Sequence, residues 1–172
     1  MKIKTRAERL SLISKICECV GIFLLSFIIF RVVFLIFDPV FASGISMMPT
    51  VQDGTLFLHN YKIDEKELCV GDIVTFKVPE YGPTNLFKRV VALPGDTVQI
   101  INGYLYVNGE LSPYNYEEIE KPGLFANTYT VPDNSFIGMG DNRNHSDDSR
   151  KFGAVPIDNI IYIINQNEQY DL

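Results

Sequence analysis

Two residues in this sequence are of the types needed for nucleophilic catalysis without a histidine. Ser46 lies between Gly44 and Pro49, where a glycine allows close backbone approach and a proline fixes the chain. Lys88 stands in an apolar, strand-like stretch, where burial would lower the pKa of its amine. A neutral lysine amine can take the proton of a serine hydroxyl and turn that serine into a nucleophile. The two residues are therefore candidates for Ser-Lys chemistry, although each signal is weak when taken alone.

Both segments also have a purely structural interpretation. Residues 43–50 read as a Ser/Gly/Pro linker when taken alone. Lys88 could face solvent with Arg89 inward, or both could protect an edge strand, because neighbours on a strand face opposite sides. The residues alone leave these alternatives open.

The densest polar run of the chain covers residues 138–150. It reads as a solvated loop or, from its Asp spacing, as a calcium loop, but it lacks the terminal Glu of an EF-hand. Its two arginines favour a scaffold of Arg-carboxylate pairs over a metal cage. His59 and His145 are the only histidines, and either is typical of a polar surface. No His/Cys cluster has metal-ligand spacing, so the sequence predicts no metal and no cofactor.

Short β-prone runs separated by turn residues follow Pro39 and would carry these side chains. Asn102-Gly103 between two such runs predicts a type I′ hairpin, and residues 112–130 are typical of a longer excursion. We therefore expect a mostly β protein, a compact antiparallel barrel or sandwich behind one N-terminal transmembrane helix. The predicted strands are Thr55–Leu58, Ile73–Val78, Phe87–Leu93, Thr97–Ile101, Tyr104–Val107, Ser135–Met139 and Ile160–Ile164.

The net charge of -6 averages two unlike pieces. Residues 1–42 hold six basic and three acidic residues, whereas residues 43–172 hold nine basic and eighteen acidic residues. An acidic body argues against nucleic acid as a partner, since phosphates require surplus Lys and Arg. A basic, apolar head is thus joined to an acidic body.

Residues 16–37 are apolar apart from Glu18 and Arg31. As a helix they would extend about 33 Å, enough to cross a bilayer core of about 30 Å. Most of the basic residues of the head precede this run, which predicts a cytoplasmic N-terminus. The alternatives are a buried core helix and a signal peptide that is cleaved after Ala42, although the apolar run is longer than an ordinary signal core.

The expected organisation is a cytoplasmic basic segment (residues 1–15), a transmembrane anchor (16–37) and an extracytoplasmic β-rich domain (38–172). Cys17 and Cys19 fall in the anchor and Cys69 is alone in the body, so the body has no internal disulfide. Cys69 is expected to be a small buried hydrophobic residue.

Taken together and in this order, four segments resemble bacterial type I signal peptidases, the membrane-bound serine proteases that remove signal peptides. They are Ser46–Thr50, Gly71–Val74, Lys88–Asp96 and Gly140–Arg150, and the resemblance extends over roughly residues 15–164. The hairpin at Asn102-Gly103 also looks like the family's. Any one of these motifs is weak, whereas four in order behind an apolar helix are specific.

The resemblance implies that Ser46 is the nucleophile and Lys88 the general base of an endopeptidase that cuts after small residues at -3 and -1. It implies that Ser146 orients Lys88 and that Gly44 stands where some relatives have a serine donor for the oxyanion. Arg89 would pair with Asp141. Further residues are expected in a scaffold (Arg143, Asp148 and Arg150) and in the substrate pockets (Met47, Val51 and Phe87).

The implied partners are preproteins with signal peptides and the lipid bilayer, with a single-pass protein in the cell membrane. One alternative is another Ser-Lys peptidase of related β fold, of the self-cleaving repressor type, which would carry a DNA-binding head instead of a membrane helix. The other is a membrane-anchored binding module without catalysis. The sequence carries no signal for the oligomeric state.

Overall fold

The computed structural model describes residues 6–37, 39–58, 61–63, 66–82, 85–164, 166 and 169–170, so His59 lies outside the described residues. The chain divides into two units, Met1–Asp38 and Pro39–Leu172. Each is described here by itself.

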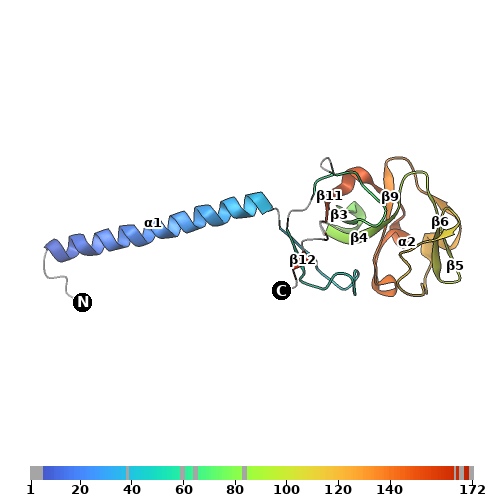
Figure 1. The fold of residues 1–172 in the computed structure, drawn as a ribbon, viewed down its shortest axis with the longest axis horizontal. Coiled ribbons are helices and arrows are strands. Elements are labelled where there is room, and N and C mark those ends of the chain that lie inside the picture. Colours follow the sequence, from blue (N-terminus) through green and yellow to red (C-terminus); the bar gives the residue numbers. More distant parts are fainter. Residues whose placement is uncertain are drawn as a thin grey trace. The chain divides into compact units, whose positions relative to one another are not determined.

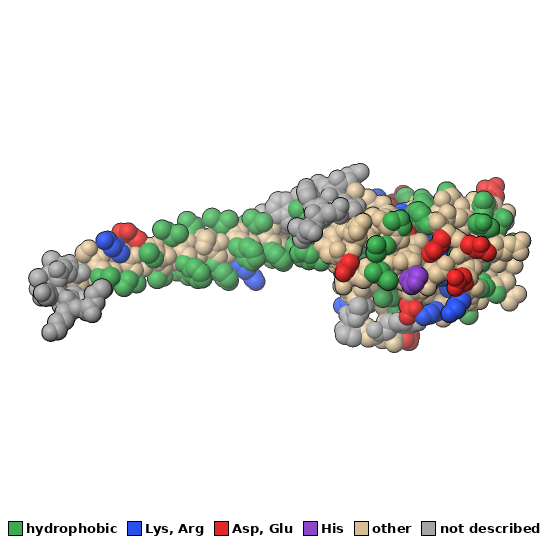
Figure 2. Space-filling model, turned by 90° about the horizontal axis from the view of Figure 1, so that it is seen from below, with side chains coloured by type: hydrophobic (Ala, Val, Ile, Leu, Met, Phe, Trp, Pro, Cys, Tyr) green, Lys and Arg blue, Asp and Glu red, His purple; other side chains and the backbone are tan. Residues whose placement is uncertain are grey.

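The first unit contains one helix, α1 (Arg6–Phe37). Its long run of Leu, Ile and Phe holds no proline, and it ends two residues before Pro39, whose ring disfavours helix in the residues before it. The helix starts ten residues before the apolar run predicted from the sequence. Within it, Arg9–Leu35 is apolar enough to cross a membrane, with a mean hydropathy of 2.4 and no part of that window buried. Figure 2 shows its surface covered by hydrophobic side chains over most of its length.

The second unit is built of short strands, with antiparallel pairing throughout the described ladders. The mostly β antiparallel body predicted from the sequence is therefore confirmed. The strands are β1 (Val40–Phe41), β2 (Leu56–Phe57), β3 (Ile73–Lys77), β4 (Asn85–Ala92), β5 (Thr97–Ile101), β6 (Tyr104–Val107), β7 (Glu110–Leu111), β8 (Tyr129–Thr130), β9 (Ser135–Met139), β10 (Val155–Pro156), β11 (Ile160–Ile163) and β12 (Gln169–Tyr170).

These strands form three sheets, with the orders β1-β2-β12, β10-β9-β4-β3-β11 and β7-β6-β5-β8. Figure 1 shows β3, β4, β9 and β11 in one part of the body and the β5-β6 hairpin in another. The hairpin turns at Asn102 and Gly103, both with positive φ, as the sequence predicted. Helical turns complete the unit: η1 (Pro79–Tyr81), η2 (Gly123–Ala126), η3 (Arg143–His145), α2 (Ser149–Phe152) and η4 (Ile157–Asn159).

Strand β4 is the centre of the five-stranded sheet and is buried on both faces. Val90 and Val91 are both fully buried, and they pack into two different hydrophobic clusters. Of the alternatives for this pair, a solvent-facing Lys88 and a protected edge strand are both wrong, because β4 is central and both side chains are buried, at 3% and 4% exposure. Since both faces of this part of β4 are covered, both charged side chains need partners inside the protein.

Two further expectations change with the structure. Cys69 is exposed rather than buried, because it lies in the turn before β3 and not in a strand. The excursion over residues 112–130 is partly regular, since it contains η2 and β8, and β8 pairs with β5 at the edge of a sheet.

Candidate active site

Ser46 lies in a tight turn between β1 and β2 that is held at both ends. Gly44, at φ 95°, donates its N–H to Asp53 Oδ1 at 2.8 Å. On the other side, the backbone N–H of Asn142 donates to the Ser46 carbonyl and its side-chain amide donates to the Ile45 carbonyl, both at 3.0 Å. The position of the serine is therefore fixed by a residue almost a hundred positions away in the sequence.

Asn142 was not singled out by the sequence analysis. It belongs to the polar run of residues 138–150, and that run was the only signal that could have found it. A sequence cannot show which of several neighbouring polar residues reaches across to a distant loop.

Strand β4 brings Lys88 to this serine. Lys88 Nζ donates to Ser46 Oγ at 2.7 Å, and the two residues are 42 positions apart in the sequence. Burial lowers the pKa of Lys88 from 10.5 to about 8. The nearby carboxylates raise this pKa, whereas the positive charge of Arg150 lowers it, as burial does. A large share of the amine is then neutral in mildly alkaline solution, the form that can accept a proton.

Gly138 on the neighbouring strand β9 leaves room for the Lys88 side chain. A Cβ at Gly138 would lie 3.2 Å from Lys88 Cβ and equally close to the ring of Phe136. The glycine is thus part of how the sequence accommodates a lysine inside a packed sheet.

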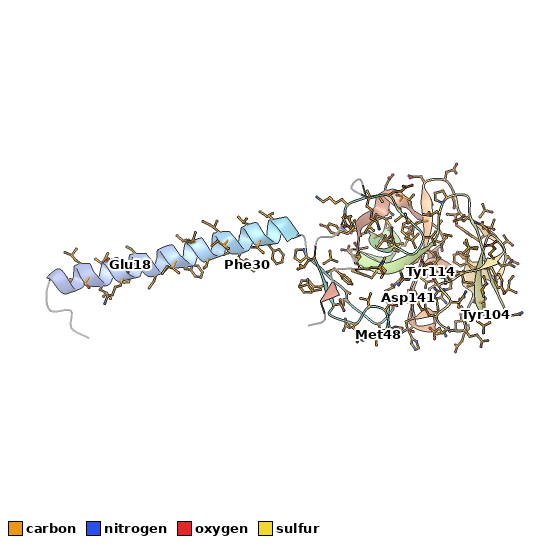
Figure 3. The ribbon with its side chains drawn as sticks, in the orientation of Figure 1. Glu18, Phe30, Met48, Tyr104, Tyr114 and Asp141 are labelled. Carbon is orange, nitrogen blue, oxygen red and sulfur yellow. The ribbon has the colours of Figure 1, made fainter. Side chains whose placement is uncertain are left out.

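The ion pair expected between Arg89 and Asp141 is present. Arg89 Nε and Nη2 donate to the two carboxylate oxygens, at 2.9 and 2.7 Å for the shortest contacts, and Nη1 donates to the Gly71 carbonyl. The guanidinium also lies 5.3 Å from the ring centre of Tyr114 and 5.6 Å from that of Tyr116. Figure 3 shows Asp141 and Tyr114 in the same region of the body. A buried, bidentate pair of this kind anchors the loop after β9 to the strand that carries Lys88.

Asp148 and Arg150 form the second buried pair. Asp148 accepts from Arg150 Nε and Nη2, each at 2.8 Å, and also from the Gly140 N–H at 3.1 Å. The same carboxylate caps the start of α2 by accepting from the Arg150 N–H. One carboxylate thereby fixes both the end of β9 and the start of the last short helix.

Gly140 packs against both the Ser146 side chain and the backbone of Ser46. A Cβ at Gly140 would lie 2.2 Å from Ser146 Oγ and 2.5 Å from the Ser46 carbonyl oxygen. The Ser146 hydroxyl is buried and has no hydrogen-bond partner in the part of the chain that the structure describes. The hydrogen bond between Ser146 and Lys88 that the resemblance implies is therefore not made among the described residues, where Lys88 donates to Ser46.

The three residues expected to line substrate pockets are Met47, Val51 and Phe87. They are buried, at 2%, 2% and 8% exposure, in one hydrophobic cluster with Phe57 and Ile73. They are packed into the core, and none of them is among the residues that line the groove beside the Ser46 turn. An open groove of about 280 Å³ lies beside the same turn, lined by Met48, Pro49, Tyr116, Glu117, Asp141 and Asn142.

His145 is exposed and its Nδ1 lies 3.1 Å from Asn142 Oδ1. It supports the residue that holds the Ser46 turn, and its recorded contact is not with the serine or the lysine. Within the described ranges, no three His, Cys, Asp or Glu side chains are grouped so that they could hold a metal ion.

Comparisons with known proteins identify the family of this chain. The family model for "Signal peptidase, peptidase S26" matches residues 15–165. A probable signal peptidase I-1 of Synechocystis is 38% identical over 74% of this chain and 69% of its own length. Signal peptidase I V of Bacillus subtilis is 34% identical over 73% of this chain and 82% of its own. A crystal structure of a signal peptidase I from Enterococcus faecalis covers 58% of this chain and 98% of its own, at 28% identity and a TM-score of 0.47.

The chain is a hydrolase of the serine peptidase class and belongs to the signal peptidase family, peptidase S26. Membership supports cleavage of signal peptides from preproteins as its activity, and the apolar helix α1 fits the membrane association of the family.

Proposed function

We propose that this protein is a membrane-anchored endopeptidase in which Ser46 is the nucleophile and Lys88 the general base. The observation that carries the proposal is the 2.7 Å hydrogen bond between Lys88 Nζ and Ser46 Oγ, made by a lysine whose burial lowers its pKa to about 8. A lysine in its ordinary charged state could donate to the serine but could not deprotonate it.

The reaction follows from this pair. Neutral Lys88 takes the proton of Ser46, and Oγ bonds to the carbonyl carbon of the -1 residue of the preprotein. The C–N bond then breaks, and Lys88 gives the proton to the departing amine of the mature protein. In the second half, Lys88 takes a proton from water, whose oxygen attacks the acyl-enzyme. The signal peptide leaves as a carboxylate and Ser46 regains its proton.

The developing oxyanion needs two preorganised donors. The N–H of Ser46 is one in this proposal. The N–H of Gly44 is already donated to Asp53, so the second donor is a different group. Some relatives have a serine at this position as a donor. In this chain the backbone at position 44 has φ 95°, which glycine adopts without strain and a serine would not.

The family membership supports specificity for small residues at -3 and -1, and the tight packing of Met47, Val51 and Phe87 fits it. Side chains packed this closely leave little room for a large residue among them. Processing of preproteins that carry Ala, Val or Leu at -1 or at -3, followed by N-terminal sequencing, tests this. Equal rates for Ala and Leu at -1 would contradict it.

Substitution of each residue tests the assignment of the catalytic pair. Ser46→Ala and Lys88→Ala should each abolish processing of a preprotein by the full chain in membranes. Ser43→Ala and Lys77→Ala are matched controls, since both residues are exposed and lie on the same turn and the adjacent strand. Thermal unfolding shows whether each variant is folded. Normal cleavage by a folded Lys88→Ala variant would disprove the role of the lysine.

The proposed topology places residues 1–15 in the cytoplasm, α1 across the membrane and the body outside. The surplus of Lys and Arg before the apolar run supports this orientation. Cys69 is free and exposed in the body, so in a Cys17→Ser/Cys19→Ser background it should react with a membrane-impermeant maleimide in intact cells. Labelling only after lysis would reverse the orientation.

A further inference from the structure

Three guanidinium groups are buried around the active site, and among the described residues two carboxylates form salt bridges with them. Asp141 is bound to Arg89, and Asp148 is bound to Arg150. Both carboxylates use both of their oxygens in these pairs. The third guanidinium, that of Arg143, has no salt bridge within the described residues, so the cluster is one negative charge short.

Arg143 has contacts that satisfy part of its hydrogen-bonding capacity but not its charge. Nη2 donates to the Tyr114 carbonyl, and Nη1 lies 3.8 Å from Met139 Sδ. The guanidinium lies 5.7 Å from the ring centre of Tyr116. Nε has no hydrogen-bond partner among the described residues, although the residue is only 1% exposed. A buried cation in this situation is costly unless an anion joins it.

A cleft of about 370 Å³ lies against this arginine. Its lining contains more basic than acidic side chains, in a body that is acidic overall. Figure 2 shows a histidine on one face of the body with acidic and basic side chains close to it. The lining residues are Glu120, Lys121, Gly123, Arg143, Asn144, His145, Ser146, Asp147, Arg150 and Lys151.

The acidic residues of the cleft do not neutralise it. Asp147 is paired with Lys151. Glu120 is then the remaining carboxylate of the lining, and it faces two positive charges in the balance, those of Lys121 and Arg143. Guanidinium groups favour oxyanions, which accept two parallel N–H bonds. The volume is ample for a phosphate group together with water.

We propose that this cleft binds a small phosphate-type oxyanion, free or as the headgroup of a lipid, and that the bound anion shifts catalysis to higher pH. Arg143 is the buried cation of this site and Lys121 its exposed one. The second half of the proposal rests on the proposed role of Lys88.

The coupling follows from the charges that already act on Lys88. Asp148, Asp147 and Asp141 raise its pKa, and Arg150 lowers it. An added anion at the cleft would act as the carboxylates do and would also offset the effect of the arginine. More of the lysine would then be charged at a given pH, and the alkaline pH needed for activity would be higher.

Calorimetric titration of the full chain in phosphatidylcholine nanodiscs with inorganic phosphate, at constant ionic strength set with chloride, tests binding without using activity. Saturable binding is expected. Lys121→Glu should weaken it and Glu120→Gln should strengthen it, each by about twofold to fivefold. Lys77→Glu, a change of the same charge on an exposed strand residue outside the cleft lining, should leave it unchanged.

Absence of saturable binding would overturn the proposal, and equal effects of Lys121→Glu and Lys77→Glu would overturn the location. Phosphate should also move the acid limb of kcat/KM to higher pH in the wild type and less in Lys121→Glu. Binding without that movement would overturn the coupling. If Lys88→Ala were fully active, the proposed base would fall, while the binding result would stand.

A second arm separates the two sources of the oxyanion. Nanodiscs that contain phosphatidylglycerol should compete with inorganic phosphate, and so weaken its apparent binding, if a headgroup reaches the cleft. Unchanged phosphate binding in those discs supports a free anion. In either case Lys121→Glu must reduce the binding for the proposal to hold.

Discussion

The pH dependence of cleavage is the sharpest test of the Ser46-Lys88 assignment. The pKa of Lys88 is about 8, so about a tenth of the amine is neutral at pH 7, about half at pH 8 and about nine tenths at pH 9. Since only the neutral amine accepts the serine proton, kcat/KM should rise about tenfold per pH unit below pH 7 and level off above pH 9. With the ordinary pKa of 10.5 the activity would still be rising at pH 10.

A variant at the surface shifts this profile in a known direction. The carboxylate of Asp147 raises the pKa of Lys88, so Asp147→Asn should lower that pKa and move the acid limb to lower pH. Because Asp147 is exposed and paired with Lys151, solvent screens the effect, and the gain at pH 7 should be at most about twofold. Glu110→Gln, an exposed carboxylate on β7, is the matched control and should leave the profile in place.

The assay is the initial rate of processing of one preprotein at low concentration between pH 6 and pH 10, so that kcat/KM refers to the free enzyme. A profile that is flat, or one with its half-maximum near pH 10, would refute the reasoning from burial. An Asp147→Asn profile displaced to higher pH would refute the assigned sign.

Three further outcomes follow from the packing of the site. Gly140→Ala should cost about 1–3 kcal/mol of stability and at least about tenfold in kcat/KM, because the new Cβ meets Ser146 Oγ and the backbone of the nucleophile's turn. Denaturant unfolding measures the stability, and processing rates measure kcat/KM. A variant with full activity and unchanged stability would contradict the close approach. Asp148→Asn should cost about 3–5 kcal/mol in the free energy of unfolding, since it leaves the Arg150 guanidinium buried without its carboxylate. Lys88→Met should inactivate the enzyme but raise its stability at pH 7 by up to about 3 kcal/mol. The unfolded lysine binds more protons than the folded one between pH 8 and pH 10.5, so wild-type stability should rise through that window while that of Lys88→Met should not.

The β elements were predictable because their signals are local. Alternating apolar residues and Asn-Gly turns act over a few positions, and the strands β3, β5, β6 and β9 lie within a residue of where the sequence placed them. The edge strands β1, β7, β8 and β10 each have two residues, too few for any periodic pattern. Their positions depend on partners that are distant in the sequence.

The alternatives for Lys88 and Arg89 could not be decided from the sequence. Alternation on a strand predicts one inward and one outward side chain only if one face of the sheet meets water. Here the second face of β4 is covered by the loop that carries Asp141 and by the rings of Tyr114 and Tyr116. No property of residues 85–92 reveals that cover.

The sequence by itself determined the chemical types: an apolar helix, a β body, a serine in a turn and a lysine in an apolar strand. It also determined the family, through the order of four motifs. Only the tertiary structure decided that Lys88 meets Ser46, that Asn142 holds the nucleophile's turn, and that Arg143 has no salt bridge to a described carboxylate. Side-chain type and spacing are set along the chain, whereas burial, and with it the pKa of Lys88, depends on what the fold packs around each group.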